Sequence, residues 1–368
     1  MFKEKKNIVR LVLFLMAAGL AVFSFTYGVV QLGHRESGYQ TIDYENTHGD
    51  VLYKSGLTLR YWAEGSSAEI RELTANVKKV YSDSLWRNYA YLDARETYEG
   101  FVNLATLNNS PGESFVLPET LARILLDAWD KTGRNEGYSV LAGVMYDEWQ
   151  TLLYLDDATG FDPSENAAQA ERLEALAAWT APDSGLTLEI ETAADGTVTA
   201  CLQVPDDYAK LLAEMETDAP TLDLNLMHDA YLMDLVAEDL RSAGYTDAVL
   251  FSKTGLCLML RPDEYLQVYL RTEDKEPALT AQGPAASVRF AAGERLGDGY
   301  GSYMLNGLKR HYWFDARTGG FRNLVDTAVM TGPPDAAALS WELIRLNCSE
   351  DPGKLEQAEG IRCTWTPQ

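Results

Sequence analysis

The chain has 368 residues, of which 46% are hydrophobic and 11% aromatic, so it can bury a sizeable core in one large domain or two smaller ones. Its 31 Lys and Arg residues stand against 55 Asp and Glu residues, which gives a formal net charge of -24 at pH 7. Because such a surface repels a phosphate backbone, the composition excludes nucleic acid as a partner.

The first predicted element is a membrane anchor. An uncharged run, residues 11–33, follows a basic tip that contains Lys3, Lys5, Lys6 and Arg10. About 20 apolar residues span a bilayer, and positive residues stay on the cytoplasmic side. The alternative is a cleaved signal peptide, but the run exceeds the usual ~7–15-residue apolar core and no clear A-x-A site follows it. We therefore expect a single-pass protein of the cell membrane that contacts the lipid bilayer through residues 11–33.

The body of the chain is expected to lie outside the cytoplasm, behind this anchor. Residues 34–50 are polar and predict a stalk, so the folded domain is expected to span residues 51–368. Alternation of apolar and polar residues over 57–61 predicts a strand. Ser66 and Glu69 have the spacing of a capping box, which predicts the start of a helix.

Later segments alternate between helix and strand signals. Pro118 is expected to open a helix, and residues 164–179 to form another. Two alternating runs on either side of Asp195-Gly196 predict a hairpin with a type I′ turn.

The C-terminal third is expected to be mostly strand. Helices are predicted at 206–216 and 227–243, with Gly244 as the stop, and a last helix near Pro334. Short strands are predicted at 247–251, 256–261, 265–271, 287–291, 310–314 and 325–331. The elements show no strict βαβ alternation, so the predicted fold class is α+β, a single domain of mainly antiparallel strands with packed helices.

Four cysteines are spread over the second half of the chain, at positions 201, 257, 348 and 363. None forms a C-x-x-C pair, which makes a zinc site improbable. An oxidising exterior permits disulfides, and Cys348 with Cys363 is the first pairing to test because both lie near the C-terminus. Four buried thiols are the equally weighted alternative.

Two stretches carry the chemistry. Residues 222–234 read LDLNLMHDAYLMD, and residues 307–319 read GLKRHYWFDARTG. They resemble the D-L-G-G-I-A-K-G-Y-A-V-D and G-K-R-Y-H-H-I-I-D-P-R-T-G segments of the FAD:protein FMN transferases, the ApbE-type family. The resemblance covers roughly residues 44–346 and rests on the order and spacing of the motifs.

The resemblance implies a flavin-transferase-like fold and Mg²⁺-assisted transfer of FMN from FAD to a Ser or Thr hydroxyl of a membrane redox protein. It assigns a catalytic role to Asp315 and a metal-binding role to Asp335. Residues implied to bind the flavin nucleotide are Asp223, Tyr231, Thr318 and Gly319. Tyr231 and Asp315 are therefore expected to lie near one shared cleft.

This sequence departs from the family pattern where a diphosphate would lie. Asn225 and Leu226 stand at the paired glycines, and Asp229 stands at the lysine that would neutralise the phosphates. A second hypothesis follows, in which the chain is a degenerate, non-catalytic member that uses no cofactor and acts as a binding or assembly module. Weak or absent FAD binding is the corresponding prediction.

The metal position is also altered, and two alignments with the family's A-D-A-L-S-T-A segment stay open. One alignment keeps Asp335 as the metal carboxylate but places Leu339 where the family has threonine. The other matches residues 338–340 and replaces the two metal ligands by Ala337 and Trp341. Mg²⁺ requires oxygen ligands, so the second alignment predicts no metal site.

Overall fold

The computed structural model describes residues 36–44, 55–155, 158–261, 266–271, 277–283, 286–291, 302–311, 313–320 and 324–367. The predicted anchor, residues 11–33, lies outside this part of the chain. Within the described ranges, no helix combines the length and the apolar character that a membrane crossing requires.

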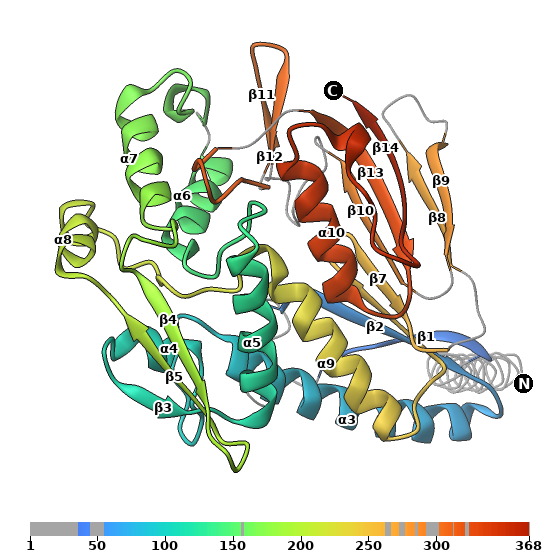
Figure 1. Ribbon diagram of the computed structural model, residues 1–368. Helices are drawn as coiled ribbons and strands as arrows, with labels where there is room; N and C mark the ends of the chain where they lie inside the picture. The colour runs from blue at the N-terminus through green and yellow to red at the C-terminus, as the bar shows by residue number, and fades with distance from the viewer. Residues whose placement is uncertain are drawn as a thin grey trace, which may run out of the picture.

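A seven-stranded antiparallel sheet forms one layer of the molecule (Figure 1). Its strand order is β1-β2-β6-β7-β10-β13-β14. The strands, in that order, are Gly38–Ile42, Leu57–Ala63, Ala248–Ser252, Leu256–Met259, Ala286–Ala291, Val325–Gly332 and Arg362–Pro367. Every neighbouring pair in the sheet is antiparallel.

Three helices form the layer that packs on this sheet: α3 (Ser67–Leu92), α9 (His228–Ser242) and α10 (Ala336–Cys348). Helix α9 runs between the other two and contacts α3, α10 and strand β6 (Figure 1). Its buried residues include Leu232, Val236 and Leu240. The N-terminal end of α9 is therefore enclosed by neighbours on several sides.

A smaller three-stranded sheet with further helices lies beside this layer (Figure 1). Its order is β3-β5-β4, formed by Ser114–Val116, Val198–Gln203 and Thr187–Thr192. The helices around it are α4 (Leu104–Asn109), α5 (Glu119–Gly133), α6 (Gly143–Tyr154), α7 (Ala167–Ala178) and α8 (Asp206–Glu214). Two hairpins complete the described strands, namely β8–β9 (Leu266–Arg271, Pro277–Gly283) and β11–β12 (Ser302–Leu305, Leu308–His311).

Several sequence predictions are confirmed by local geometry. The Ser66 side chain accepts a hydrogen bond from the Glu69 N–H, and the Glu69 carboxylate accepts one from the Ser66 N–H, so the capping box starts α3. Pro118 directly precedes α5. Gly244 has a φ of +83° just after α9, a conformation that glycine adopts at low cost.

The hairpin between β4 and β5 forms, but its turn differs from the predicted type I′. That turn needs positive φ at both central residues, and here only Gly196 has it, at +85°. The Ala193 N–H donates to the Thr197 carbonyl and the Gly196 N–H to the Ala193 carbonyl. The connection is therefore a three-residue loop in which Gly196 supplies the left-handed residue.

Part of the predicted stalk, residues 34–50, belongs to the sheet. Strand β1 pairs with β2 from Gly38–Ala63 to Ile42–Leu59, and Ile42 is buried. The segment looked like a stalk because an edge strand exposes most of its side chains and carries little apolar signal. Strands β3, β9, β11 and β14 were likewise not predicted.

Of the two open alternatives for the cysteines, the structure has the thiols: Cys348 and Cys363 are not joined, and all four cysteines are thiols, two of them buried and two half-buried. Cys348 ends α10, where its sulfur lies 3.6 Å from the Phe314 carbonyl oxygen. It also packs under Gly137, where a Cβ would lie 2.4 Å from the Cys348 Cβ. Cys363 lies on strand β14, so the two thiols belong to different elements of the fold.

Candidate functional site

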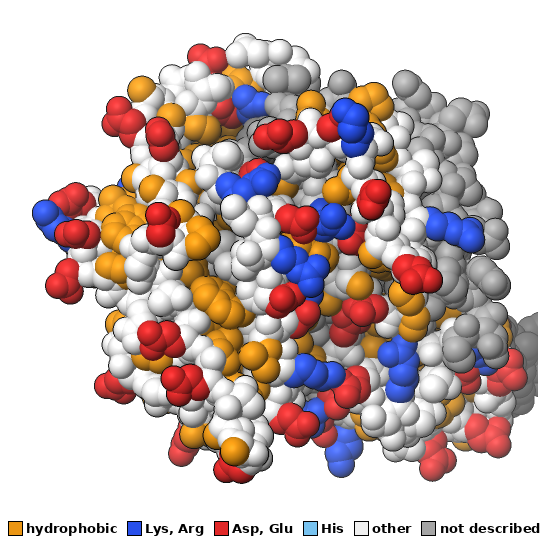
Figure 2. All heavy atoms as spheres, in the orientation of Figure 1, with side chains coloured by type: hydrophobic (Ala, Val, Ile, Leu, Met, Phe, Trp, Pro, Cys, Tyr) orange, Lys and Arg blue, Asp and Glu red, His pale blue; other side chains and the backbone are white. Residues whose placement is uncertain are grey.

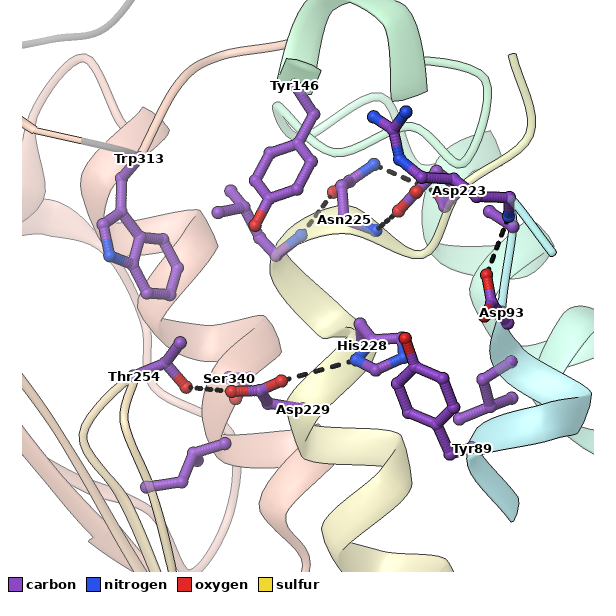
Figure 3. Close-up of a pocket in the computed structure, with 15 residues that line it drawn as sticks. Tyr89, Asp93, Tyr146, Asp223, Asn225, His228, Asp229, Thr254, Trp313 and Ser340 are labelled. Carbon is purple, nitrogen blue, oxygen red and sulfur yellow. Dashed lines mark hydrogen bonds and ion pairs between the residues drawn. The ribbon is translucent and has the colours of Figure 1, made fainter. Parts of the chain in front are cut away.

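A cavity of about 310 Å³ lies at the N-terminal end of α9 (Figure 3). Residues from α3, α6, α9 and α10 meet there with the β6–β7 turn and the segment before Asp315. The lining residues are Tyr89, Leu92, Asp93, Ala94, Arg95, Tyr146, Asp223, Asn225, Leu226, His228, Asp229, Thr254, Leu256, Trp313 and Ser340.

The approach to α9 is shaped by Asn225, whose φ is +39°. Its side-chain amide donates to the Ser139 carbonyl at 2.9 Å, and its side-chain oxygen accepts from the Leu226 N–H at 2.7 Å. Asparagine is among the few non-glycine residues that adopt a positive φ readily. Asn225 therefore holds a turn at a position where the resembling motif has glycine.

Asp223 and Asp229 place two carboxylates in the cavity (Figure 3). Asp223 Oδ1 accepts a hydrogen bond from the Asn225 N–H, and burial raises the pKa of the carboxyl group. Asp229 lies in the first turn of α9, where its Oδ2 accepts a hydrogen bond from the Thr254 hydroxyl at 3.0 Å. A carboxylate in the first turn also stabilises the helix through the macrodipole.

Asp93 contributes a third carboxylate, at the end of α3. Its oxygens accept hydrogen bonds from the Arg95 and Glu96 N–H groups and, at 2.6 Å, from the Tyr98 hydroxyl. Asp93 therefore caps a turn as well as lining the cavity. The guanidinium of Arg95 is held in an ion pair with Asp147.

His228 lies between the carboxylates and an aromatic ring. Burial lowers the pKa of its imidazole, but Asp229, Asp223 and Asp93 raise it, and the net shift is upward. The His228 Nδ1 lies 3.4 Å from Asp229 Oδ1, and the ring meets Tyr89 edge-on with centroids 5.7 Å apart. The carboxylates therefore favour the protonated form of this histidine.

Aromatic side chains and one hydroxyl complete the walls. Tyr89, Tyr146 and Trp313 all line the cavity (Figure 3). Ser340, on α10, is 2% exposed and lines it as well. Acidic, aromatic and hydroxyl groups from six separate segments thus surround one small volume.

Comparison with solved structures identifies the scaffold. The ApbE protein of Thermotoga maritima is similar with a TM-score of 0.56 at 12% identity, over 86% of this chain and 88% of that protein. A single-residue variant of the flavin transferase ApbE from Vibrio cholerae gives a TM-score of 0.50 at 13% identity, over 90% and 98%. This chain has the ApbE flavin transferase fold. The mixed helix and antiparallel-sheet prediction is thereby confirmed.

Comparison of the sequence with family models and with curated proteins found no match. Identity of 12–13% to the two ApbE structures establishes the fold alone, because one fold supports many functions. The site has to be judged from its own residues.

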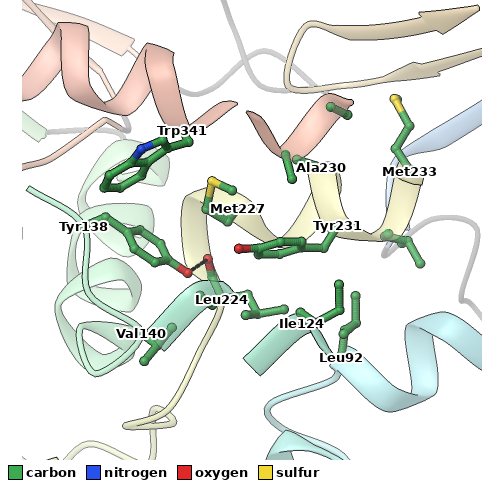
Figure 4. Close-up of a cluster of buried hydrophobic side chains, with 14 of the residues drawn as sticks. Leu92, Ile124, Tyr138, Val140, Leu224, Met227, Ala230, Tyr231, Met233 and Trp341 are labelled. Atoms are coloured by element: carbon green, nitrogen blue, oxygen red, sulfur yellow. Dashed lines mark hydrogen bonds between the residues drawn. The ribbon is translucent and has the colours of Figure 1, made fainter. Parts of the chain in front are cut away.

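Asp223 is the one predicted nucleotide-binding residue that lines the cavity at the start of α9. Tyr231 points elsewhere, into a cluster of buried hydrophobic side chains (Figure 4). It is 2% exposed, and its hydroxyl donates to Asp127 at 2.6 Å. Tyr231 follows Asp229 by two residues, and ~100° of rotation per residue places the two side chains on opposite sides of α9. Tyr231 instead lines a second cavity of about 610 Å³, together with Asp335.

This second cavity lies between α5, α9 and the start of α10. Its lining includes the basic residues Arg123, Lys131 and Arg241 and the acidic residues Asp127, Asp234, Glu238 and Asp335. Acidic and basic side chains are interspersed over this face of the molecule (Figure 2). Arg123 pairs with Glu238 at 2.6 Å and Lys131 with Asp127 at 2.5 Å, so much of this charge is internally balanced.

Asp315, Thr318 and Gly319 form a tight turn. Asp315 is 1% exposed and makes a two-point ion pair with Arg317, at 2.8 and 2.6 Å. The N–H groups of Thr318 and Gly319 donate to the Asp315 carbonyl, and the Trp149 indole donates to the Gly319 carbonyl at 2.8 Å. Asp315 lines neither of the two cavities, so the expected cleft shared by Tyr231 and Asp315 is not borne out.

Asp335 is the N-cap of α10, where its Oδ1 accepts a hydrogen bond from the Ala338 N–H at 2.8 Å. Asp234 accepts from the Ala336 and Ala337 N–H groups, each at 2.9 Å. Of the two open alignments, the one through residues 338–340 matches Ser340 with the serine of the family segment. Ser340 lines the cavity of Asp223 and Asp229. That alignment places Ala337 and Trp341, which supply no side-chain carboxylate or hydroxyl, at the metal positions.

The residues do not fit the FAD and Mg²⁺ that the ApbE fold implies. A diphosphate carries two negative charges and needs N–H donors or cations around it, whereas Asp223 and Asp229 present carboxylates to this cavity. Among the described residues, no group of three or more His, Cys, Asp or Glu side chains is placed to hold a metal ion. The carboxylates that line the cavity suit a cation better than an anion.

Sequence reasoning missed Asp93, Tyr89, Trp313 and Ser340 as site residues. Tyr89 lies in the last turn of α3, and Asp93 is the residue directly after this helix. The signature motifs include neither of them. Ser340 was visible in the alternative alignment of the metal segment, but not as a cavity residue. His228 was adjacent to Asp229 in the motif and could have been noticed as its neighbour.

Proposed function

We propose that this chain is an extracytoplasmic binding module, built on the ApbE fold and tethered to the cell membrane by residues 11–33, that does not transfer FMN. One observation carries the proposal. Asp229, at the position of the family's lysine, lines one cavity together with Asp223, and this pair of carboxylates would repel a diphosphate bound there.

The electrostatic cost of this reversal is large. Like charges about 4 Å apart repel by about 4 kcal/mol at an effective dielectric of about 20. Micromolar affinity corresponds to about 8 kcal/mol, so this repulsion removes about half of the binding free energy. The ion-paired Arg95 is too exposed to offset it, since its side chain is 52% accessible.

FMN transfer is the second candidate function. The shared fold over 86% of the chain favours it, as does the retained turn at Asn225. In that case the chain would take FMN from FAD, with Mg²⁺ offsetting phosphoryl charge, and attach it to a Ser or Thr hydroxyl of a membrane redox protein. The altered lining residues make this the weaker candidate.

Titration calorimetry of the detergent-solubilised full chain with FAD, with and without MgCl₂, tests the proposal. We expect no saturable binding in the micromolar range. The double variant Asp229→Lys with Leu226→Gly should raise FAD affinity by at least tenfold, because it replaces a repulsive charge by an attractive one. Asp130→Asn, on the exposed side of α5, is the control and should change nothing.

A second assay addresses the chemistry directly. The chain is incubated with FAD, MgCl₂ and a threonine-containing acceptor protein, and covalent flavin is read by in-gel fluorescence. Vibrio cholerae flavin transferase serves as the positive control. Tight FAD binding together with flavin transfer by the unmodified chain would overturn the proposal and establish FMN transfer.

A further inference from the structure

The disagreement between the cavity and a diphosphate points to a ligand of opposite charge. We propose that the cavity formed by Asp223, Asp229 and Ser340 binds an alkylammonium group, carried by a free primary amine or by a lysine side chain. This inference rests on the proposed binding role, since a transferase would need the same cavity for FAD.

Two acceptor atoms of the cavity are without a partner. Ser340 is 2% exposed and lines the cavity, yet its hydroxyl makes no hydrogen bond within the described ranges of the chain. Asp223 uses Oδ1 to hold the Asn225 N–H, and its Oδ2 accepts no hydrogen bond from the described residues. A polar side chain as buried as Ser340 is normally paired, and the open Asp223 oxygen lines the same cavity, so the two groups point to a ligand that donates hydrogen bonds.

Asp229 supplies a third acceptor in the same cavity. Its Oδ2 accepts a 3.0 Å hydrogen bond from the Thr254 hydroxyl, and its Oδ1 makes only a long 3.4 Å contact with His228 (Figure 3). A carboxylate has about four acceptor positions, so capacity remains for a ligand. An ammonium group has three donors and no acceptor, which matches the open oxygens of Ser340, Asp223 and Asp229.

The aromatic walls favour an organic cation. Tyr89, Tyr146 and Trp313 line the same cavity, and aromatic faces attract an ammonium group within about 6 Å. The volume, about 310 Å³, is at the small end of ligand pockets, so it suits the end of one chain and not a dinucleotide.

A metal ion explains these residues less well. Mg²⁺ and Ca²⁺ require several oxygens at about 2.0–2.6 Å around one point. Asp93 already directs its oxygens to two backbone N–H groups and the Tyr98 hydroxyl. No metal-binding group of three His, Cys, Asp or Glu side chains occurs in the described part of the chain.

Ligand-observed NMR and calorimetry on the detergent-solubilised full chain provide the test. The probes are n-butylammonium chloride and its neutral isostere 1-butanol, then a tri-lysine peptide and its side-chain-acetylated form. Saturable binding of a charged probe, without binding of its neutral counterpart, supports the proposal. Binding of the peptide alone identifies a lysine side chain as the source, and binding of butylammonium alone identifies a free amine.

Variants locate the binding in this cavity. Asp229→Asn should weaken binding by about tenfold or more, because it removes a charge-assisted hydrogen bond. Ser340→Ala keeps the helix and should weaken binding several-fold, whereas Asp130→Asn should leave it unchanged. Circular dichroism and melting curves check that each variant is folded. If Asp229→Asn is not folded, the binding measured for Ser340→Ala tests the location of the site.

Three results would overturn the ammonium site. They are equal binding of 1-butanol and butylammonium, displacement of the amine by MgCl₂ at equal concentration, and binding that Ser340→Ala and Asp229→Asn both leave intact. The same sample is titrated with FAD. Absence of both amine and FAD binding overturns this inference but leaves the non-transferring role standing, while tight FAD binding overturns that role as well.

Discussion

Buried acidic residues have distinct tasks in this protein, set by their donors. Asp162 is fully buried and accepts hydrogen bonds from Arg310 at 2.7 Å and from the Tyr303 hydroxyl at 2.6 Å. The other carboxylate oxygen of Asp162 accepts hydrogen bonds from the N–H and the hydroxyl of Ser164. Asp162 thereby fastens the β11–β12 hairpin to the segment after η1 (Ala158–Phe161).

Replacing Asp162 by alanine should destabilise the protein by about 3 kcal/mol, because a buried guanidinium and hydroxyl lose this carboxylate. Glu165→Gln is the matched control, since Glu165 contacts the same hairpin through Asn306 at an exposed site and should cost under about 1 kcal/mol. Denaturant unfolding measures both. Equal, small effects would show that the ion pair contributes nothing.

The same residue gives a pH dependence. Burial alone would raise the pKa of Asp162, but Arg310, Ser164 and Tyr303 outweigh it, and the folded-state pKa lies below the ordinary value. The stabilising contribution is therefore complete above the unfolded pKa of about 3.9 and is lost as the pH falls through the folded value. The gap in stability between wild type and Asp162→Ala should narrow in acid.

At the scale of the element, the start of α10 depends on Asp234 of α9. Its carboxylate accepts from the first two N–H groups of α10, which ties the two helices together. The pKa of Asp234 is raised to about 7, and burial is the largest cause. Asp335 raises this pKa further, whereas the Ala336 N–H and Arg241 lower it. A helix N-terminus is thus held by a carboxyl group that titrates near neutral pH.

Because the folded pKa is raised, the stabilising contribution of Asp234 is present in acid and is lost as the pH rises through about 7. Asp234→Asn does not titrate, so its stability relative to wild type should improve by on the order of 2 kcal/mol between pH 5 and pH 8. Thermal unfolding at both pH values measures this. A pH-independent difference would refute it, and Asp130→Asn should change little at either pH.

At the scale of the whole molecule, the sequence predicts that the acidic body is tethered to a membrane by its N-terminus. The apolar run at residues 11–33 and the basic residues before it predict that the N-terminus stays attached. Intact mass spectrometry of protein extracted from membranes should find residues 1–33 present. A mature chain that begins after residue 24 would contradict the anchor and indicate a cleaved signal peptide.

Local patterns were sufficient for most of the helices and for the fold class. The Ser66–Glu69 cap, Pro118 before α5 and Gly244 after α9 act over three or four residues, so neighbours in sequence determine them. Strand β1 escaped because it is an edge strand with few buried side chains. The turn at Gly196 escaped because one positive-φ residue suffices in a three-residue loop.

The sequence by itself determined that residues 222–234 and 307–319 resemble the ApbE motifs, and that Asp229 reverses a charge within them. Only the tertiary structure decided which side chains meet, because a cavity is closed by contacts between distant segments. It brought Asp93 and Ser340 to Asp223, turned Tyr231 to the opposite side of α9, and confined Asp315 to a turn with Arg317. A motif reports chain order and residue type, whereas helix rotation and packing determine where each side chain points.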